Sequence, residues 1–413
     1  MRRDLWRVWL GAPIVVALMA VVLAPAPAGA TTVGDETTFR AAWTNASETT
    51  IDLSADITLT CGGGGVSTRN SATALTLDGH GHTIQQTCAA NGVLAQTGTG
   101  TLTMSNVTVT GGAAPAGGVG GINGGDANVT LNDSSVTANH VSTTGGCGGV
   151  GGATITLNRS SVSGNQVNGS QGTAGVCGGT VVLDASTVSD NTLTGGLGNG
   201  GISGATVVLR NSTVSGNQTG NFSTAGVAAG TAILVNSTVS NNVTGASDAN
   251  NVGGVRSSSI TLVYSTVVQN SSPGRSNLGQ TDGSTNVTSF GSVVALPLGG
   301  GTNCATGATT SNGFNFTDDT SCGFPAAETH AGVNPMLDAL GANGGSTLTR
   351  VPQSGSPLVD AIAPASCQDD GASAITTDQR GLERPSPTGG ACDIGAVEVQ
   401  VAAPVVLAPT FTG

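Results

Sequence analysis

The middle of the chain repeats a short pattern of alternating apolar and polar residues, and each run ends at glycine or asparagine. Alternation with a period of two residues indicates β-strands, and the terminal Gly or Asn indicates a turn. Looser copies begin at Ala74 and Thr101, and the central apolar residue of the copies recurs every 25–28 residues. Six further twelve-residue segments align without gaps and begin at Asn128, Thr154, Thr180, Thr206, Thr231 and Ser259.

A repeat of about 26 residues is too short to bury its own apolar face. Stacked copies bury a continuous core, because each copy covers the apolar face of its neighbour. The pattern therefore predicts an all-β fold, a right-handed parallel β-helix in which each coil contributes two or three short strands. We expect the repeats of this solenoid to occupy residues 51–331.

The last residue of each aligned repeat is an asparagine. Stacked side-chain amides can hydrogen-bond from coil to coil, and asparagine tolerates the left-handed conformation of a tight corner. We therefore predict a structural asparagine ladder, rather than glycosylation or ligand sites, at Asn139, Asn165, Asn191, Asn217, Asn242 and Asn270.

The first thirty residues have the organisation of a signal peptide. Three arginines precede a short apolar stretch, and Ala28-Gly29-Ala30 forms a cleavage motif. The alternative is a retained N-terminal membrane anchor, which the shortness of the apolar stretch disfavours. We expect a secreted protein that keeps no stable transmembrane segment once residues 1–30 are removed.

Both ends of a β-helix need a cover for their open apolar layers. Residues 31–50 are expected to supply the N-terminal cap, as a short helix with Phe39, Ala42 and Trp43 on one face. At the other end, the charged residues of the segment 332–399 are expected to form ion pairs that close the helix as an irregular cap.

Eight cysteines remain after removal of the signal peptide, and export to an oxidising compartment favours disulfide bonds. Eight cysteines allow 105 pairings. We predict that each cysteine pairs with its neighbour along the chain. The sequence has no CxxC motif, which would have favoured a zinc site. The residues concerned are Cys61, Cys88, Cys147, Cys177, Cys304, Cys322, Cys367 and Cys392.

Composition and charge narrow the range of partners. The formal net charge is −12, lysine is absent, and charged residues make up only 9% of the chain. A nucleic-acid-binding protein needs a basic face that neutralises phosphates, so this class is excluded. Aromatic residues, which stack on sugars, are 3%. The partners that remain are extracellular polysaccharides or cell-surface components.

Acidic residues of the repeats are sparse and occupy different columns of the predicted stack. Asp133 precedes Arg159 by one coil, and Asp184 precedes Arg210 in the same way, so we interpret both as exposed cross-coil pairs. A glycosidase would place two carboxylates in one groove. No such pair can be recognised in the sequence, and we assign no catalytic residue.

Two histidines raise the question of a metal site. His80 and His82 alternate onto the same predicted face as Asp78, but these residues alone do not complete a ligand set. We therefore assign no metal ligand and no cofactor. Calcium bound by the acidic residues of the segment 332–399 is the alternative.

The coils resemble the repeats of right-handed parallel β-helix proteins with the pectate-lyase-like (pectin lyase-like) architecture, and residues 78–84 (DGHGHTI) are similar to a segment near the start of such helices. The C-terminal motifs resemble the choice-of-anchor Q domain of bacterial surface proteins. These motifs are Asn334-Pro335-Met336-Leu337, residues 342–347 (ANGGST), residues 355–360 (GSPLVD), residues 377–381 (TDQRG) and residues 392–396 (CDIGA). This resemblance implies a domain over residues 332–399, followed by a flexible tail over 400–413.

These observations predict a secreted or cell-envelope-associated β-helix protein that is structural or adhesive and not an enzyme. One alternative is a pectate-lyase-like polysaccharide lyase or glycosidase with a divergent site, since the architecture hosts such enzymes but does not determine function. Another is a calcium-dependent or glycan-binding module. Activity on polysaccharides would distinguish the enzyme from the structural or adhesive protein. Stabilisation of the fold by Ca²⁺ would distinguish the calcium-dependent module.

Overall fold

The computed structural model describes residues 29–64, 67–221, 223–245, 249–280, 284–367 and 375–401. Nearly all of the predicted signal peptide, residues 1–28, and residues 402–413 of the predicted tail lie outside these ranges. Within the described ranges, no helix is both long enough and apolar enough to cross a membrane.

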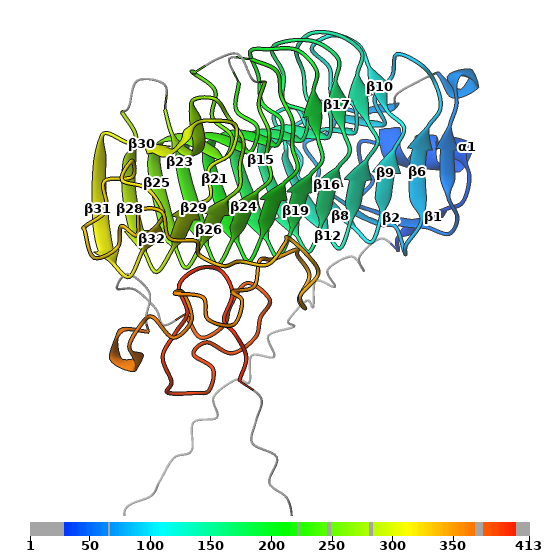
Figure 1. The fold of residues 1–413 in the computed structure, drawn as a ribbon. Helices are drawn as coiled ribbons and strands as arrows, with labels where there is room; N and C mark the ends of the chain where they lie inside the picture. Colours follow the sequence, from blue (N-terminus) through cyan, green and yellow to red (C-terminus); the bar gives the residue numbers. More distant parts are fainter. Residues whose placement is uncertain are drawn as a thin grey trace, which may run out of the picture.

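The chain winds into a solenoid whose strands stack in parallel sheets (Figure 1). The first and largest sheet has 17 strands in the described part of the chain. They are β1 (Thr31–Val33), β2 (Thr50–Leu53), β4 (Ser67–Arg69), β5 (Leu75–Asp78), β7 (Leu94–Gln96), β8 (Leu102–Ser105), β11 (Ile122–Asn123), β12 (Asn128–Asn132), β15 (Val150–Asn158), β18 (Val176–Asp184), β21 (Ile202–Arg210), β23 (Val227–Val235), β25 (Val255–Val263), β27 (Arg275–Gly279), β28 (Asn286–Phe290), β30 (Thr302–Ala305) and β31 (Ala308–Gly313).

Two further sheets complete the wall of the solenoid. The second sheet contains β3 (Ile57–Leu59), β6 (Thr83–Gln86), β9 (Thr108–Thr110), β13 (Ser135–Thr137), β16 (Ser161–Ser163), β19 (Thr187–Ser189), β22 (Thr213–Ser215), β24 (Thr238–Ser240), β26 (Thr266–Val268), β29 (Val293–Ala295) and β32 (Phe316–Thr317). The third contains β10 (Ala113–Ala114), β14 (His140–Val141), β17 (Gln166–Val167) and β20 (Thr192–Leu193). In the residues described, the helical elements are α1 (Glu36–Thr44) and the short 3₁₀ turns η1 (Cys61–Gly63) and η2 (Pro364–Ser366).

Successive coils stack in register, residue upon residue. Leu157 of β15 pairs with Leu183 of β18, which pairs with Leu209 of β21, and all three are fully buried. Burial of one such side chain contributes about 1.5–3 kcal/mol, and a slip of one residue would turn the whole column outward. The predicted all-β parallel β-helix is confirmed.

The predicted asparagines lie in a buried column at one corner of the coils. Asn165 Nδ2 donates to Asn191 Oδ1 at 3.0 Å, and the same oxygen accepts the backbone N–H of Asn165 at 3.0 Å. The other steps from Asn139 to Asn270 repeat this pair of bonds at 2.8–3.1 Å. The column continues through an asparagine that was not predicted, Asn277, whose Oδ1 accepts from Asn270 at 2.9 Å. Each buried amide is thus satisfied by the coils next to it.

Helix α1 covers the N-terminal end of the core. Asp35 caps the helix by accepting the backbone N–H of Thr38 at 2.9 Å. Phe39, Ala42 and Trp43 are buried, and the two aromatic rings stack with their centroids 6.0 Å apart. The predicted capping helix is confirmed, because its apolar face packs on the first coils instead of facing solvent.

All eight cysteines form disulfides between neighbours along the chain, as predicted. The pairs are Cys61–Cys88, Cys147–Cys177, Cys304–Cys322 and Cys367–Cys392. The first three connect parts of the solenoid. The fourth lies within the C-terminal segment.

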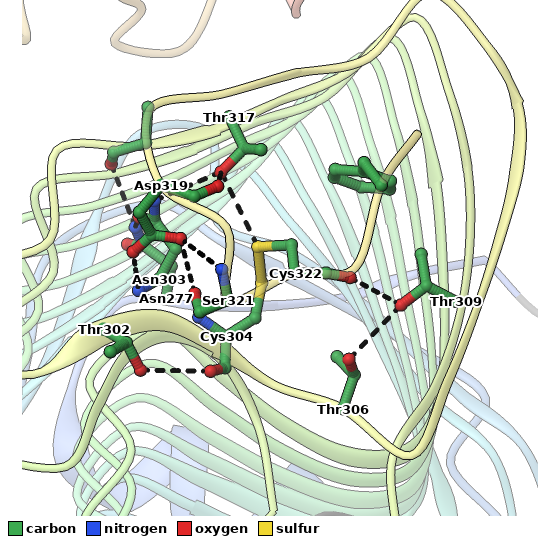
Figure 2. Close-up of a disulfide and its surroundings, with 12 residues drawn as sticks. Asn277, Thr302, Asn303, Cys304, Thr306, Thr309, Thr317, Asp319, Ser321 and Cys322 are labelled. Carbon is green, nitrogen blue, oxygen red and sulfur yellow. Dashed lines mark hydrogen bonds between the residues drawn. A yellow bond between two sulfur atoms is a disulfide. The ribbon is translucent and has the colours of Figure 1, made fainter. Parts of the chain in front are cut away.

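An irregular stretch over residues 318–331 closes the C-terminal end of the core. Figure 2 shows its disulfide between Cys304 and Cys322, and Phe324 is buried in the same apolar cluster. The Asp319 carboxylate holds the turn by accepting the backbone N–H groups of Asn303 at 3.0 Å and Ser321 at 2.9 Å. The apolar layer at this end is therefore covered before residue 332.

The segment that begins at residue 332 lies along the side of the solenoid, as the orange and red ribbon in Figure 1 shows. Its contacts reach from Ala185, which accepts the hydroxyl of Ser346, to Gly291, which accepts the N–H of Gly395. The expectation that this segment closes the end of the helix is therefore wrong. The end is already filled by Phe324, whereas the side offers many hydrogen-bonding groups.

Candidate functional site

The turn between the first and second sheets has the same left-handed conformation in successive coils. We call the residues at this position the corner residues. Their φ values are 45–51°, and they are Asn106, Asp133, Arg159, Ala185, Asn211, Asn236 and Tyr264. Because the backbone repeats, the carbonyl groups and side chains of the corner residues form regular columns along one side of the solenoid.

A buried serine follows most corner residues and supports the column from inside. Ser160 Oγ accepts the backbone N–H of Ser134 at 3.1 Å, and Ser186 Oγ accepts that of Ser160 at 3.0 Å. This serine ladder was not predicted. Its signal is present in the sequence, because serine recurs at this position in every aligned repeat.

A groove runs along the corner residues, between them and the outward hydroxyl groups of the second sheet. We call it the corner groove. Its open half has a volume of about 320 Å³. The groups that line it include Asn106, Asp133 and Arg159 on the corner side and Thr108, Ser135 and Ser161 on the strand side. None of its lining residues is aromatic.

The C-terminal segment covers the other half of the corner groove, beyond Ala185. Three hydrogen bonds join residues 346–348 to it: Ser346 Oγ donates to Ala185 O (3.1 Å), Thr347 Oγ1 donates to Asn211 O (3.1 Å), and Thr213 Oγ1 donates to Leu348 O (2.6 Å). The corner residues are accordingly exposed at Asp133 and Arg159 and buried at Asn236 and Tyr264.

Two buried polar side chains of the C-terminal segment bind the second sheet. Gln379 Nε2 donates to Thr213 Oγ1 at 2.8 Å, and Gln379 Oε1 accepts from Thr238 Oγ1 at 2.6 Å. Arg350 Nε donates to Ser240 Oγ at 2.9 Å. These contacts are recognised only in the folded chain, because they join positions more than 100 residues apart.

A buried charged cluster holds the rest of the segment to the solenoid. Arg384 lies over the ring of Tyr264 at 4.2 Å, and its Nε is 3.4 Å from Glu398 Oε2. Burial raises the pKa of Glu398 to about 7, although the neighbouring Arg384 opposes this shift. Arg380 forms a second ion pair with Asp378 at 2.7 Å. The predicted ion pairs therefore exist, but they stabilise the side contact.

The open half of the groove contains one ion pair. Arg159 donates twice to Asp133 at 2.7 Å, which confirms the predicted cross-coil pair. The hydrogen bond from Arg159 lowers the pKa of Asp133, and the same bond raises the pKa of Arg159. Neither group therefore exchanges a proton near neutral pH. Asp184 and Arg210 are register partners, but no ion pair joins them in the described part of the chain.

The histidines near the N-terminal end face separate carboxylates. His80 lies 3.8 Å from Asp52 and 3.8 Å from Asp78, whereas His82 Nδ1 is 3.2 Å from Asp56. Across the residues that the structure describes, no three His, Cys, Asp or Glu side chains form a group that could hold a metal ion.

Comparison with known proteins gives one similarity. Residues 30–147 match the model of a family described as a putative pectate lyase-like adhesive domain. No curated protein and no solved structure matches the chain. The matched residues include α1, the first coils and the part of the open groove that Asn106, Asp133 and Ser135 line.

Proposed function

We propose that the protein is a secreted, cell-envelope-associated adhesive β-helix protein without catalytic activity, and that the open half of the corner groove is its contact surface. The observation that carries this proposal is a groove of about 320 Å³, lined by hydroxyl groups on a rigid stack of coils, partly within the residues that match the adhesive domain. Complete pairing of the eight cysteines supports secretion, because disulfides persist in oxidising compartments.

The absence of catalysis is supported by the chemistry of the groove. An enzyme acting there would need a group that gives or takes a proton near its working pH. The pairing of Asp133 with Arg159 moves both pKa values away from neutrality. The likeness of residues 332–399 to choice-of-anchor Q domains supports a location at the cell envelope.

The test is a retention assay with beads that carry the purified chain. The beads are placed on surfaces of acidic polysaccharide, neutral polysaccharide and cell-surface protein, with and without Ca²⁺, and the supernatant is analysed for cleavage products. Beads with the same chain, reduced, alkylated and unfolded, are the control. We expect retention that needs the folded chain and releases no products. New reducing ends or unsaturated products, or no retention on any surface, would refute the proposal.

A further inference from the structure

The covered half of the corner groove shows which kind of chain the groove accepts. There the occupant is polypeptide, residues 346–350, which bends at Ser346 and Thr347 and contacts successive coils from Ala185 to Ser240. Its hydroxyl groups donate to corner carbonyls, and one of its carbonyls accepts a hydroxyl of the second sheet, Thr213. The solenoid therefore recognises a main chain with small hydroxyl side chains.

The open half presents the same two rows of groups, the carbonyl groups of the corner residues and the hydroxyl groups of the second sheet. The backbone φ values of Asp133 and Arg159 are 48° and 47°, close to the 48° and 51° of Ala185 and Asn211. All four residues donate their backbone N–H to the next coil at 3.0–3.1 Å, so the corner backbone repeats from the open half into the covered half. Within the described residues, the carbonyl oxygens of Asp133 and Arg159 accept no hydrogen bond. Ser161 occupies the place that the donor Thr213 has in the covered half.

The chain itself leaves the groove at the boundary between the halves. Gly344 and Gly345 have φ values of +93° and +76°, which L-residues with side chains rarely adopt. This turn lies just before Ser346, which lines the open half, and Gly345 packs against Arg380 of the same segment. The open half is therefore a direct continuation of an interface that is already filled by polypeptide.

We propose that the open half of the corner groove binds a short polypeptide segment of a partner protein, rich in Ser, Thr and Gly, laid end to end with residues 346–350. This inference rests on the proposed adhesive function and names the ligand of the same site. The open half extends over three coil steps, from Asn106 to Ala185. At about 4.8 Å for each step this is roughly 14 Å, the length of about four residues of extended chain. A polypeptide fits better than a glycan, because the groove offers no aromatic face for a sugar ring.

The test uses the full chain and a fluorescent peptide that copies residues 345–349, presented in several copies on one carrier so that avidity makes weak binding measurable. The variant Ser161→Trp fills the groove. Ser163→Trp is the matched control, because Ser163 lies on the same strand, β16, but does not line the groove. Ser135→Trp, one coil earlier, is a second blocking variant. Melting temperatures verify that each variant folds.

We expect the peptide carrier to bind the original chain and Ser163→Trp equally, and to bind both blocking variants at least tenfold more weakly. Absence of peptide binding, or equal loss in Ser163→Trp, would overturn the inference. An oligosaccharide that binds the original chain and is blocked by Ser161→Trp, without peptide binding, would assign the groove to glycans instead. Bead retention without peptide binding would remove this inference and leave the adhesive function, whereas loss of both would remove both.

Discussion

Replacement of one asparagine of the ladder tests whether these buried amides hold the coils together. Asn191 is fully buried in the middle of the column. Its Nδ2 donates to Val162 O at 3.0 Å and to Asn217 Oδ1 at 2.9 Å. Its Oδ1 accepts the backbone N–H and the Nδ2 of Asn165, both at 3.0 Å. Asn191→Ala removes all four bonds and leaves the backbone N–H of Asn165 buried without a partner.

The expected loss of stability follows from these contacts. A net contribution of about 1 kcal/mol for each hydrogen bond gives about 4 kcal/mol, and a buried donor left unpaired costs about 1–3 kcal/mol more. We therefore expect Asn191→Ala to lower the free energy of unfolding by about 5–7 kcal/mol. Because each coil contacts only its neighbours, the loss falls on the two interfaces that this coil makes.

Guanidinium unfolding, followed by circular dichroism, measures this loss. The matched control is Asn128→Ala, since Asn128 is exposed at the start of β12 and outside the ladder. We expect the control to stay within about 0.5 kcal/mol of the original chain. A loss below about 1 kcal/mol in Asn191→Ala would show that the amides fill space without binding the coils.

Three further results are expected. Because burial raises the pKa of Glu398 to about 7, its contribution to stability is complete below the unfolded value of 4.5, falls as the pH rises and is lost above about 7. The change is about 3 kcal/mol, and melting curves between pH 4 and 8 should show this slope in the original chain but not in Glu398→Gln. The double variant Cys304→Ser, Cys322→Ser should lower the free energy of unfolding by about 3 kcal/mol, because the disulfide closes a loop of 18 residues at the end of the core. An unchanged denaturant midpoint would contradict this expectation. Gln379→Ala removes the two hydrogen bonds that the Gln379 side chain makes with Thr213 and Thr238 of the second sheet. Residues 346–350 should then exchange amide hydrogens at least tenfold faster while β15 and β18 keep their rates. Equal rates throughout would show that other contacts suffice.

The repeating part of the molecule was predictable because its interactions connect equivalent positions. Leu157, Leu183 and Leu209 occupy the same place in successive repeats, and a parallel stack sets each directly on the next. The same argument applied to the asparagine column and would have applied to the serine ladder, since both recur at a fixed position. The capping helix was recognisable because its apolar face has a helical period.

The place of the C-terminal segment could not be predicted in this way. Its motifs and charged residues were visible, and ion pairs within the segment were anticipated. Tyr264, on which Arg384 lies, however belongs to a coil more than 100 residues earlier. No periodicity connects two such positions, so the contact depends on shape and hydrogen bonding that exist only after the coils have stacked.

The sequence by itself determined the coil, its register and the polar columns, because these features depend on interactions that recur once in every repeat. Only the tertiary structure decided that residues 318–331 close the end, that the segment after residue 332 lies along the side, and that half of the corner groove stays open. Those features depend on contacts between unlike parts of the chain, and each contact occurs once. The candidate site lies at the boundary that these single contacts create.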